Sequence, residues 1–430
     1  MAAPGIDPVR KATVRKALYR AGHERTVAGL RATLPASDRR TGLHAARGSS
    51  LPAIALSCYG DISEVQQQWQ DFETHAIGTL YQKELWCRAW LETAGAALGA
   101  SPRIILARDG SGQLRFVLPF QVRRRQGVRV LEWLGSPHHN YGFGLYDPAF
   151  MSSAEEWFSA NWISVIEAAG EWDAVSLTEM PSHLFGRRNP MRPAFNMRGA
   201  NASFLLHLES DFDELDKRKR SSERRRTARK SEAALARQVD ISFGLPQDLP
   251  ATHVIIDTMF AQQQQRLAEL GIHGVFGPAE RQFIHRLADL QDPSSPVLAP
   301  YHLKCGPDVQ SVMLGGIHAN GYWALISSLA AGPYRRFSPG DIALRRTIAA
   351  CCTRGLDFFD FSAGDTPYKR QWSDETIPLF QVIKARNLKG LAWCSAMALR
   401  VLVKRTIKQT PLLLAASQAL RKLVLGKRTD

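Results

Sequence analysis

The sequence is short of cysteines, of long apolar runs and of acidic residues near its two ends. The chain has 430 residues and six cysteines. No two of them stand in a C-x-x-C pair, the spacing typical of zinc sites and of thioredoxin-like redox sites. We therefore expect reduced, mostly buried thiols and no bound metal.

The chain also has no stretch of about 18 uninterrupted apolar residues, so we expect no transmembrane helix. Its first residues do not contain the apolar segment of a secretory signal. Together these two absences predict a cytoplasmic protein.

Acidic residues are scarce at the two ends, while the net charge of the whole chain is +15. Residues 1–50 contain ten Lys or Arg and three Asp or Glu, a net charge of +7. Residues 391–430 contain eight Lys or Arg and one Asp, again +7. The 340 residues between them therefore carry only +1 (15 − 7 − 7). This near-neutral body argues against a broad nucleic-acid-binding face, so nucleic acid is not an expected partner.

The length of the chain predicts two domains. Hydrophobic periodicity and turn signals divide it into a basic, disordered extension over 1–50, units over 51–200 and 201–390, and a basic helical tail over 391–430. Both units show the same element order, namely helices, an antiparallel meander, a helix and a strand. The expected strands are 53–58, 103–108, 114–122, 128–134, 174–177, 203–208, 239–243, 297–304, 309–318, 322–329, 356–361 and 379–384. The expected helices are 61–72, 83–97, 155–169, 211–237, 249–270, 278–290, the segment ending at 354, and 368–372.

The most informative segment follows the strand expected over 322–329. A strand, a loop of small residues and a helix N-terminus together present backbone N–H groups to an anion such as a pyrophosphate. Proline suits the first helical turn, and an acidic residue there favours the helix N-terminus. The residues of this loop and first turn are Arg335, Arg336, Phe337, Ser338, Pro339, Gly340 and Asp341.

A second motif, D-F-S-A-G-D-T-P-Y-K, runs from Asp360 to Lys369. Together the two motifs resemble the GNAT acyltransferase superfamily, and most closely its CelD/BcsL (BioF-like) acetyltransferases, which are linked to cellulose and exopolysaccharide production. These are similar to the Fem aminoacyltransferases of peptidoglycan synthesis. The resemblance covers about residues 80–390 and includes W-x-x-x-W at Trp86 and Trp90 and the basic run at 224–230.

This resemblance implies an α/β (α+β) fold with tandem GNAT-like domains over 51–200 and 201–390, mixed and mainly antiparallel sheets, and C-terminal basic helices. It also implies acetyl-CoA, or another acyl-CoA, as co-substrate. In the superfamily pattern Q/R-x-x-G-x-G/A, Ser338 takes the place of the first glycine. We therefore expect this loop to have less freedom to adopt positive φ.

The resemblance also implies roles for individual residues. The loop from Arg335 to Gly340, with Asp341, would bind the pyrophosphate, and Lys369 a phosphate or a substrate carboxylate. Backbone groups near Ser328 and Leu329 would hold the thioester carbonyl. Tyr368 would protonate the leaving thiolate, and Asp360 and Asp365 are candidate bases.

Other segments carry weaker signals. The run His138-His139-Asn140-Tyr141, in a glycine-rich loop, could line an acceptor cleft, and so could Glu179. Residues 217–230 hold nine basic side chains and one acid, a run that suits a polyanion or a solvated helix face.

The expected acceptor is a small-molecule or sugar-linked amine or hydroxyl. The apolar and basic tail, interrupted at Pro411, predicts two helical segments in peripheral contact with the anionic inner face of a membrane. Two alternatives stay open: a Fem-like transferase that uses aminoacyl-tRNA, and a non-catalytic scaffold at the membrane polysaccharide machinery.

Overall fold

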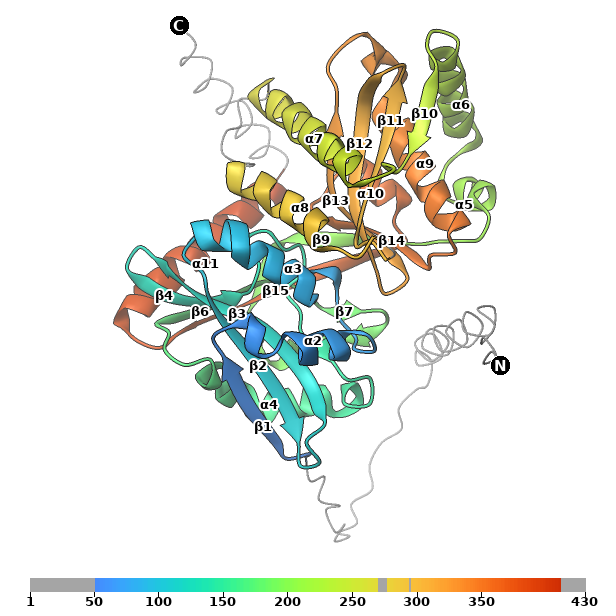
Figure 1. Cartoon of the computed structure of the whole chain (residues 1–430). Helices are drawn as coiled ribbons and strands as arrows, with labels where there is room; N and C mark the ends of the chain where they lie inside the picture. Colours follow the sequence, from blue (N-terminus) through green and yellow to red (C-terminus); the bar gives the residue numbers. More distant parts are fainter. Residues whose placement is uncertain (1–50, 270–276, 294, 411–430) are drawn as a thin grey trace, which may run out of the picture.

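The structure, a computed structural model, describes residues 51–269, 277–293 and 295–410 (Figure 1). The expected disordered extension and the segment after Pro411 lie outside these residues. The strands are β1 (Ile54–Tyr59), β2 (Ser101–Asp109), β3 (Leu114–Arg125), β4 (Val128–Trp133), β5 (Leu145–Tyr146), β6 (Ala174–Pro181), β7 (His183–Leu184), β8 (Arg187–Arg188), β9 (Met197–His207), β10 (Ile241–Gly244), β11 (Leu298–Cys305), β12 (Asp308–His318), β13 (Gly321–Leu329), β14 (Phe358–Ala363) and β15 (Glu375–Ala385).

The helices lie between groups of these strands along the chain. They are η1 (Ile62–Glu64), α2 (Gln66–Glu73), η2 (Leu80–Gln82), α3 (Glu84–Trp90), η3 (Leu91–Gly95), α4 (Met151–Ala168), η4 (Arg192–Ala194), α5 (Phe212–Lys219), α6 (Ser222–Ala236), α7 (Leu249–Glu269), α8 (Pro278–Leu290), η5 (Pro333–Phe337), α9 (Pro339–Thr353), α10 (Pro367–Trp372) and α11 (Leu388–Gln409). None of the described helices is both long and apolar enough to cross a membrane.

The single long helix expected over 211–237 is wrong, because the chain breaks it into α5 and α6. Arg220 is extended, with φ −134° and ψ 142°. Ser221 then begins α6, and its side chain accepts a hydrogen bond from the Arg224 N–H at 3.4 Å. A serine at this position satisfies a helix N–H group that otherwise has no partner, so it stabilises a new helix start.

Thirteen strands form one continuous mixed sheet whose order is symmetric. The order is β1-β2-β3-β4-β6-β15-β9-β14-β13-β12-β11-β10, with β5 paired to β3, and β7 and β8 form a separate small sheet. Among the described strands, only β4–β6 and β13–β14 pair in parallel. The predicted mixed, mainly antiparallel α/β class is confirmed.

The two halves exchange one strand each. After the first half, β9 crosses over and pairs with β14, and after the second half β15 returns and pairs with β6. The two exchanged strands also pair with each other. Because of this exchange the sheet has no break between the halves, which fixes their relative position.

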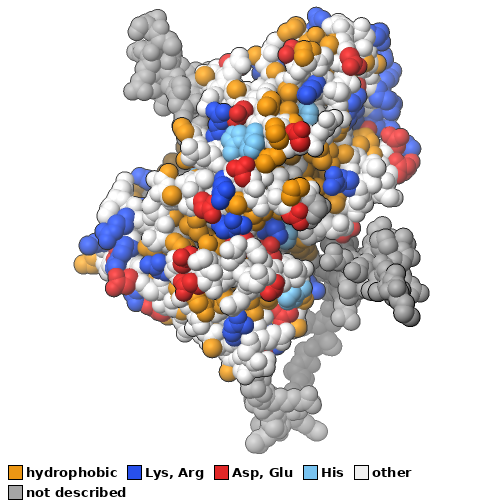
Figure 2. Space-filling view, viewed as in Figure 1, with side chains coloured by type: hydrophobic (Ala, Val, Ile, Leu, Met, Phe, Trp, Pro, Cys, Tyr) orange, Lys and Arg blue, Asp and Glu red, His pale blue; other side chains and the backbone are white. Residues whose placement is uncertain are grey.

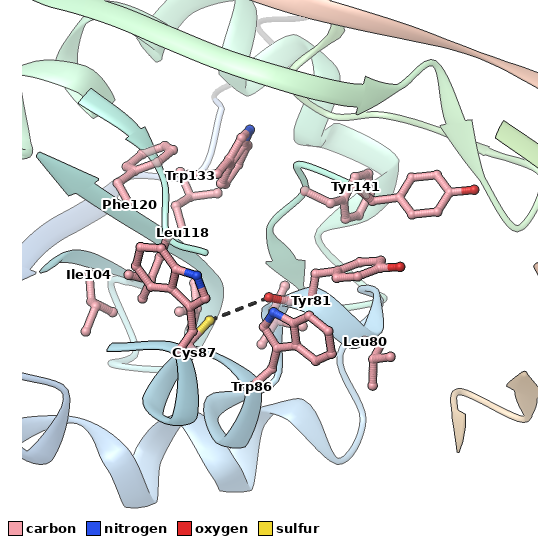
Figure 3. Close-up of a cluster of buried hydrophobic side chains, with 14 of the residues drawn as sticks. Leu80, Tyr81, Trp86, Cys87, Ile104, Leu118, Phe120, Trp133 and Tyr141 are labelled. Atoms are coloured by element: carbon pink, nitrogen blue, oxygen red, sulfur yellow. Dashed lines mark hydrogen bonds between the residues drawn. The ribbon is translucent and has the colours of Figure 1, made fainter. Parts of the chain in front are cut away.

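Helices α3 and α8 meet where the two halves join (Figure 1). The Trp86 ring packs edge-on against Phe283 with centroids 5.0 Å apart. Against α3, buried side chains from β2, β3 and β4 complete a core that includes Leu118, Phe120 and Trp133 (Figure 3). Burial of each such side chain contributes about 1.5–3 kcal/mol, so this core anchors the elements that carry the site.

Helix α11 packs across β4, β6, β9 and β15. Asn387 caps its first turn by accepting the Gly390 N–H at 2.9 Å. A Cβ at Gly390 would overlap the Asp173 carbonyl, so this glycine permits the close approach of the helix to the sheet.

Candidate active site

The parallel strands β13 and β14 pair only at their beginnings. Residues Gly321–Trp323 pair with Phe358–Asp360, after which β13 continues to Leu329 paired with β12 alone. Ser362 adopts a left-handed conformation with φ 61°, and its hydroxyl donates to the Ala324 carbonyl at the point of divergence. The strand split, as we call this region between the diverging strands, therefore leaves one backbone edge of β13 without a strand partner among the described residues.

A buried polar network lies at the base of the strand split. The Asp360 side chain is fully buried and accepts hydrogen bonds from the Tyr141 hydroxyl at 2.5 Å and the Ser362 N–H at 2.6 Å. The Tyr81 and Ser362 hydroxyls are 3.2 Å apart, and the Asn140 amide donates to Tyr81 at 2.9 Å. These five residues are called the buried network below.

The two halves of the chain contribute different parts of the buried network. Asp360 and Ser362 belong to the second half, whereas the two tyrosines come from the first half and point their hydroxyls the same way, out of the apolar core (Figure 3). Burial raises the pKa of Asp360 to about 6, although the Tyr141 and Ser362 hydrogen bonds favour its ionised form.

Lys369, on α10, adds a buried cation beside this network. Its Nζ donates to the carbonyls of Ala363 at 3.0 Å and Ser362 at 3.4 Å. Burial lowers the pKa of Lys369 to about 8, and the charges of Asp360 and Asp365 limit this decrease. The side chain is therefore mostly protonated at neutral pH and titrates just above it.

The loop between β13 and α9 lies at the other end of the strand split. Ser338 occupies the left-handed region with φ 54° and ψ 54°, and its side chain makes no capping hydrogen bond. The expectation that serine would limit positive φ here is wrong, because the residue keeps the conformation that glycine favours. The Ser231 hydroxyl of α6 donates to the Phe337 carbonyl at 2.8 Å and holds the loop in place.

The first turn of α9 is open beside Gly340. A Cβ added to Gly340 would meet only the Leu329 side chain, at 3.8 Å. Pro339 has no N–H and occupies the first helical position, as the sequence predicts. Asp341 accepts a hydrogen bond from Arg345 at 2.9 Å, so its carboxylate is paired within the helix.

The two arginines of the loop already have partners in the protein. Arg335 lies 3.5 Å from Glu269 at the end of α7. Arg336 donates to the Gln238 side chain at 3.1 Å and lies over the Phe337 ring at 4.8 Å. An anion at this loop would therefore compete with these contacts for the guanidinium groups.

The remaining predicted residues lie at different depths. Ser328 is buried on β13, where its hydroxyl donates to Gln262 at 2.7 Å, and Leu329 follows it at the end of the strand. Tyr368 is 40% exposed next to Lys369, and partial burial raises the pKa of its phenol. Asp365 is exposed and forms an ion pair with Arg370.

Two of the weaker sequence signals reach the site and others do not. Asn140 and Tyr141 join the buried network, whereas His138 lies 2.9 Å from Glu280 on α8 and His139 is buried beside β6. Glu179 accepts a hydrogen bond from Asn201. Tyr81 was not predicted, because nothing in its sequence neighbourhood distinguishes it from a core aromatic residue.

A family model and solved structures resemble this chain. Residues 222–370 match the family model described as an acetyltransferase (GNAT) domain, a range that spans the strand split, the β13–α9 loop and Lys369. No curated protein matches the sequence.

Among solved structures, FemX has a TM-score of 0.55 and 13% identity over 76% of this chain and 97% of its own. The C-terminal domain (DUF2156) of a putative lysylphosphatidylglycerol synthetase from Agrobacterium fabrum has a TM-score of 0.47 and 12% identity, covering 79% and 97%. A tandem GNAT protein from the clavulanic acid biosynthesis pathway has a TM-score of 0.40 and 10% identity, covering 78% and 99%. The chain therefore shares the fold of FemX, and residues 222–370 match a GNAT domain. The tandem GNAT-like domains over 51–200 and 201–390 and the CelD/BcsL type stay predictions.

Proposed function

We propose that this protein is an acyl-CoA-dependent acyltransferase, with acetyl-CoA as the expected donor. The acceptor is an amine or hydroxyl of a small or sugar-linked molecule. The observation that carries the proposal is the strand split, which has a helix N-terminus at one end and a buried lysine with the Asp360 network at the other.

The donor would lie along the edge of β13 that has no strand partner among the described residues. Five steps of 3.3 Å from Ala324 to Leu329 make this edge about 17 Å long, a length suited to an extended pantetheine arm. Its pyrophosphate would meet the backbone of the β13–α9 loop and the N-terminus of α9, where partial positive charge favours anions. Arg335 and Arg336 would then exchange their present partners for phosphate oxygens.

At the Lys369 end of the strand split, the nucleophile would attack the carbonyl carbon of the thioester. Negative charge would develop on the carbonyl oxygen and then on the leaving sulfur. The ammonium group of Lys369 would stabilise that charge, and its low solvent exposure strengthens the interaction. The Asp360 carboxylate is enclosed by hydrogen bonds from Tyr141 and Ser362, so we assign it a positioning role. It would hold Ser362 in place, and with it the backbone carbonyls that accept hydrogen bonds from Lys369. Tyr368 is the proposed acid for the thiolate.

The resemblance to polysaccharide-linked acetyltransferases supports a sugar-linked acceptor in exopolysaccharide, cellulose or cell-envelope synthesis, and a cytoplasmic location. Asp365 would contact an acceptor amine only if that amine displaced Arg370. The proposal therefore places the acceptor on the exposed side of α10.

An aminoacyl-tRNA donor is the second candidate. Helix α6 carries exposed Arg224, Arg226, Arg229 and Lys230, and Figure 2 shows basic side chains gathered over this helix at the upper right. Ser231 ties the same helix to the β13–α9 loop. The similarity to FemX is in fold alone, so it favours neither donor.

Calorimetry with acetyl-CoA tests the first candidate. We expect micromolar binding to the whole protein, abolished by Gly340→Trp because an indole would fill the open first turn of α9. Gly244→Trp is the matched control, since a Cβ added to Gly244 on β10 likewise meets no close neighbour. Absence of binding at millimolar acetyl-CoA, with binding of aminoacyl-tRNA, would replace the first candidate by the second.

A further inference from the structure

Helix α11 exposes an apolar stripe on the side that faces away from the sheet. Of the ten large hydrophobic side chains that are exposed in the described residues, five belong to this helix and are between 49% and 84% exposed. They are Leu388, Leu391, Leu399, Leu402 and Val403. At about 100° per residue these five fall within an arc of about 120°, so they form one continuous stripe.

The opposite side of α11 is used for packing. Trp393 and Cys394 are buried against Val128, Val130 and Ala174 of the sheet. The helix is therefore apolar on two sides, and only one of them is covered by the described part of the chain. A surface helix of a soluble protein usually carries polar side chains on its outer face, so the stripe needs another explanation.

Basic side chains border the stripe. With Leu388 placed at 0° on a helical wheel, the stripe extends from about 300° to about 60°. Lys389 and Arg400 then lie beyond one edge at about 100° and 120°, and Arg405 lies beyond the other edge at about 260°. The 22 residues of α11 include five Lys or Arg and no Asp or Glu. Figure 2 shows further basic side chains at the lower left, where the β3–β4 turn and the start of α11 lie.

A surface pocket lies directly beside this basic border. It is formed between α11 and the β3–β4 turn, and its lining includes Lys389, Arg400, Trp393, Met397 and Val128. Two cationic side chains thus stand next to an apolar floor. This combination suits a molecule with an anionic head and an apolar chain.

We propose that the outer face of α11 binds in the headgroup layer of an anionic phospholipid bilayer, parallel to its surface. The leucines would insert beneath the headgroups, and the flanking cations would contact lipid phosphates at about 1 kcal/mol each. A protein partner or a second copy would also cover leucines. The basic borders and the absence of acidic residues in α11 favour an extended anionic surface instead. The proposal does not depend on the donor site.

Vesicle flotation of the full chain tests this surface. Wild-type protein is expected to float with vesicles of phosphatidylcholine and phosphatidylglycerol, and not with phosphatidylcholine alone. Binding should fall in about 1 M salt, where the Debye length is about 3 Å. The pair Lys389→Glu and Arg400→Glu should weaken binding at least about tenfold, since each lost cation removes about 1 kcal/mol. The pair Leu399→Glu and Leu402→Glu should abolish it.

Controls separate membrane binding from general effects. Leu98→Glu with Ile163→Glu changes two exposed hydrophobic side chains outside α11, and this variant should float like wild type. Circular dichroism without vesicles checks folding, and the single change Leu399→Ser, which should weaken flotation, serves if the double variant does not fold. Wild-type protein that stays unbound at low salt would overturn the proposal. So would a wild-type dimer that Leu399→Glu with Leu402→Glu converts to a monomer without altering flotation.

Discussion

The two halves of the sheet have the same strand order, but only one keeps its parallel pair open. In the first half, β4 and β6 pair at Val130–Ala174 and Leu131–Val175 and then diverge. The chain itself fills that divergence, because the Gly142 N–H donates to the Glu179 carbonyl at 2.9 Å and a Cβ at Gly142 would overlap Trp133. In the second half the chain passes from β13 through η5 and α9 to β14, and beyond Trp323 β13 has no described strand partner other than β12.

The residues at the two divergences differ as well. The third residue of β14 is Asp360, at the centre of the buried network, and the third residue of β6 is Ser176. The first half instead supplies Tyr81 and Tyr141, which reach across and complete the network of the second half. Under the proposed function, the second half would bind the ligand and the first half would position the polar groups of that site.

Lys369→Met should give the largest loss of activity, since it removes the buried cation beside the strand split of the second half. We expect kcat to fall about 100- to 1,000-fold, as for loss of one group that stabilises an oxyanion. In the wild type kcat should decrease as pH rises through about 8, where Lys369 loses its proton. Lys384→Met, on β15, is the control and should keep wild-type turnover. Full activity of Lys369→Met would remove this lysine from the mechanism.

The same variant has a stability signature. The folded-state pKa of Lys369 is lowered to about 8 from 10.5, so below pH 8 both states hold the proton and the folded state bears the cost of a buried charge. Between about pH 8 and 10.5 the unfolded state binds more protons, so the free energy of unfolding rises with pH. Urea titrations should show this rise in the wild type and not in Lys369→Met.

Tyr141→Phe tests whether the first half supports the site of the second. It leaves the buried Asp360 carboxylate without its 2.5 Å hydrogen bond, which should cost about 1.5–3 kcal/mol of stability. Because that bond lowers the pKa of Asp360, the variant should raise it further, and any acid limb of the activity profile should move to higher pH.

The matched control for Tyr141→Phe is Tyr146→Phe. The Tyr146 hydroxyl is also buried in the first half but has no hydrogen-bond partner among the residues that the structure describes. Its removal should leave stability unchanged or raise it, because no bond is lost. Equal losses from both variants, measured by urea unfolding, would show that burial alone and not the network sets the cost.

Gly142→Ala tests the segment that fills the first divergence. The new methyl group would overlap Trp133 and the Thr178 carbonyl, so the protein should lose about 1–3 kcal/mol of stability. Acetyl-CoA affinity of the folded fraction should not change, since the proposed donor lies in the other half. A lower affinity without lost stability would mean that the first half takes part in binding.

The sequence predicts best what is local along the chain. The start of α9 at Pro339 follows from helix-start preferences, whereas the positive φ of Ser338 does not follow from its residue type. Tyr141 and Asp360 are 219 residues apart, and no local pattern pairs them. The exchange of β9 and β15 could not be predicted either, because an apolar strand pattern does not specify which neighbouring strand it pairs with. The break between α5 and α6 is predictable from the sequence, since a serine such as Ser221 before a helical run is a helix-start signal.

Ser338→Gly should give the smallest change in stability and binding. It tests a single backbone position of the β13–α9 loop in the second half. A non-glycine residue in the left-handed region costs about 1–2 kcal/mol, and the added freedom of glycine in the unfolded chain offsets about 0.5–1 kcal/mol. We therefore expect the free energy of unfolding to rise by about 0.5–1 kcal/mol, and acetyl-CoA binding to be kept or strengthened, because the loop already has the glycine conformation. Ser338→Ala, which keeps the strain, should match wild type in urea unfolding. Weaker acetyl-CoA binding by Ser338→Gly would instead mean that the serine hydroxyl, which makes no capping bond in the free protein, contacts the donor directly.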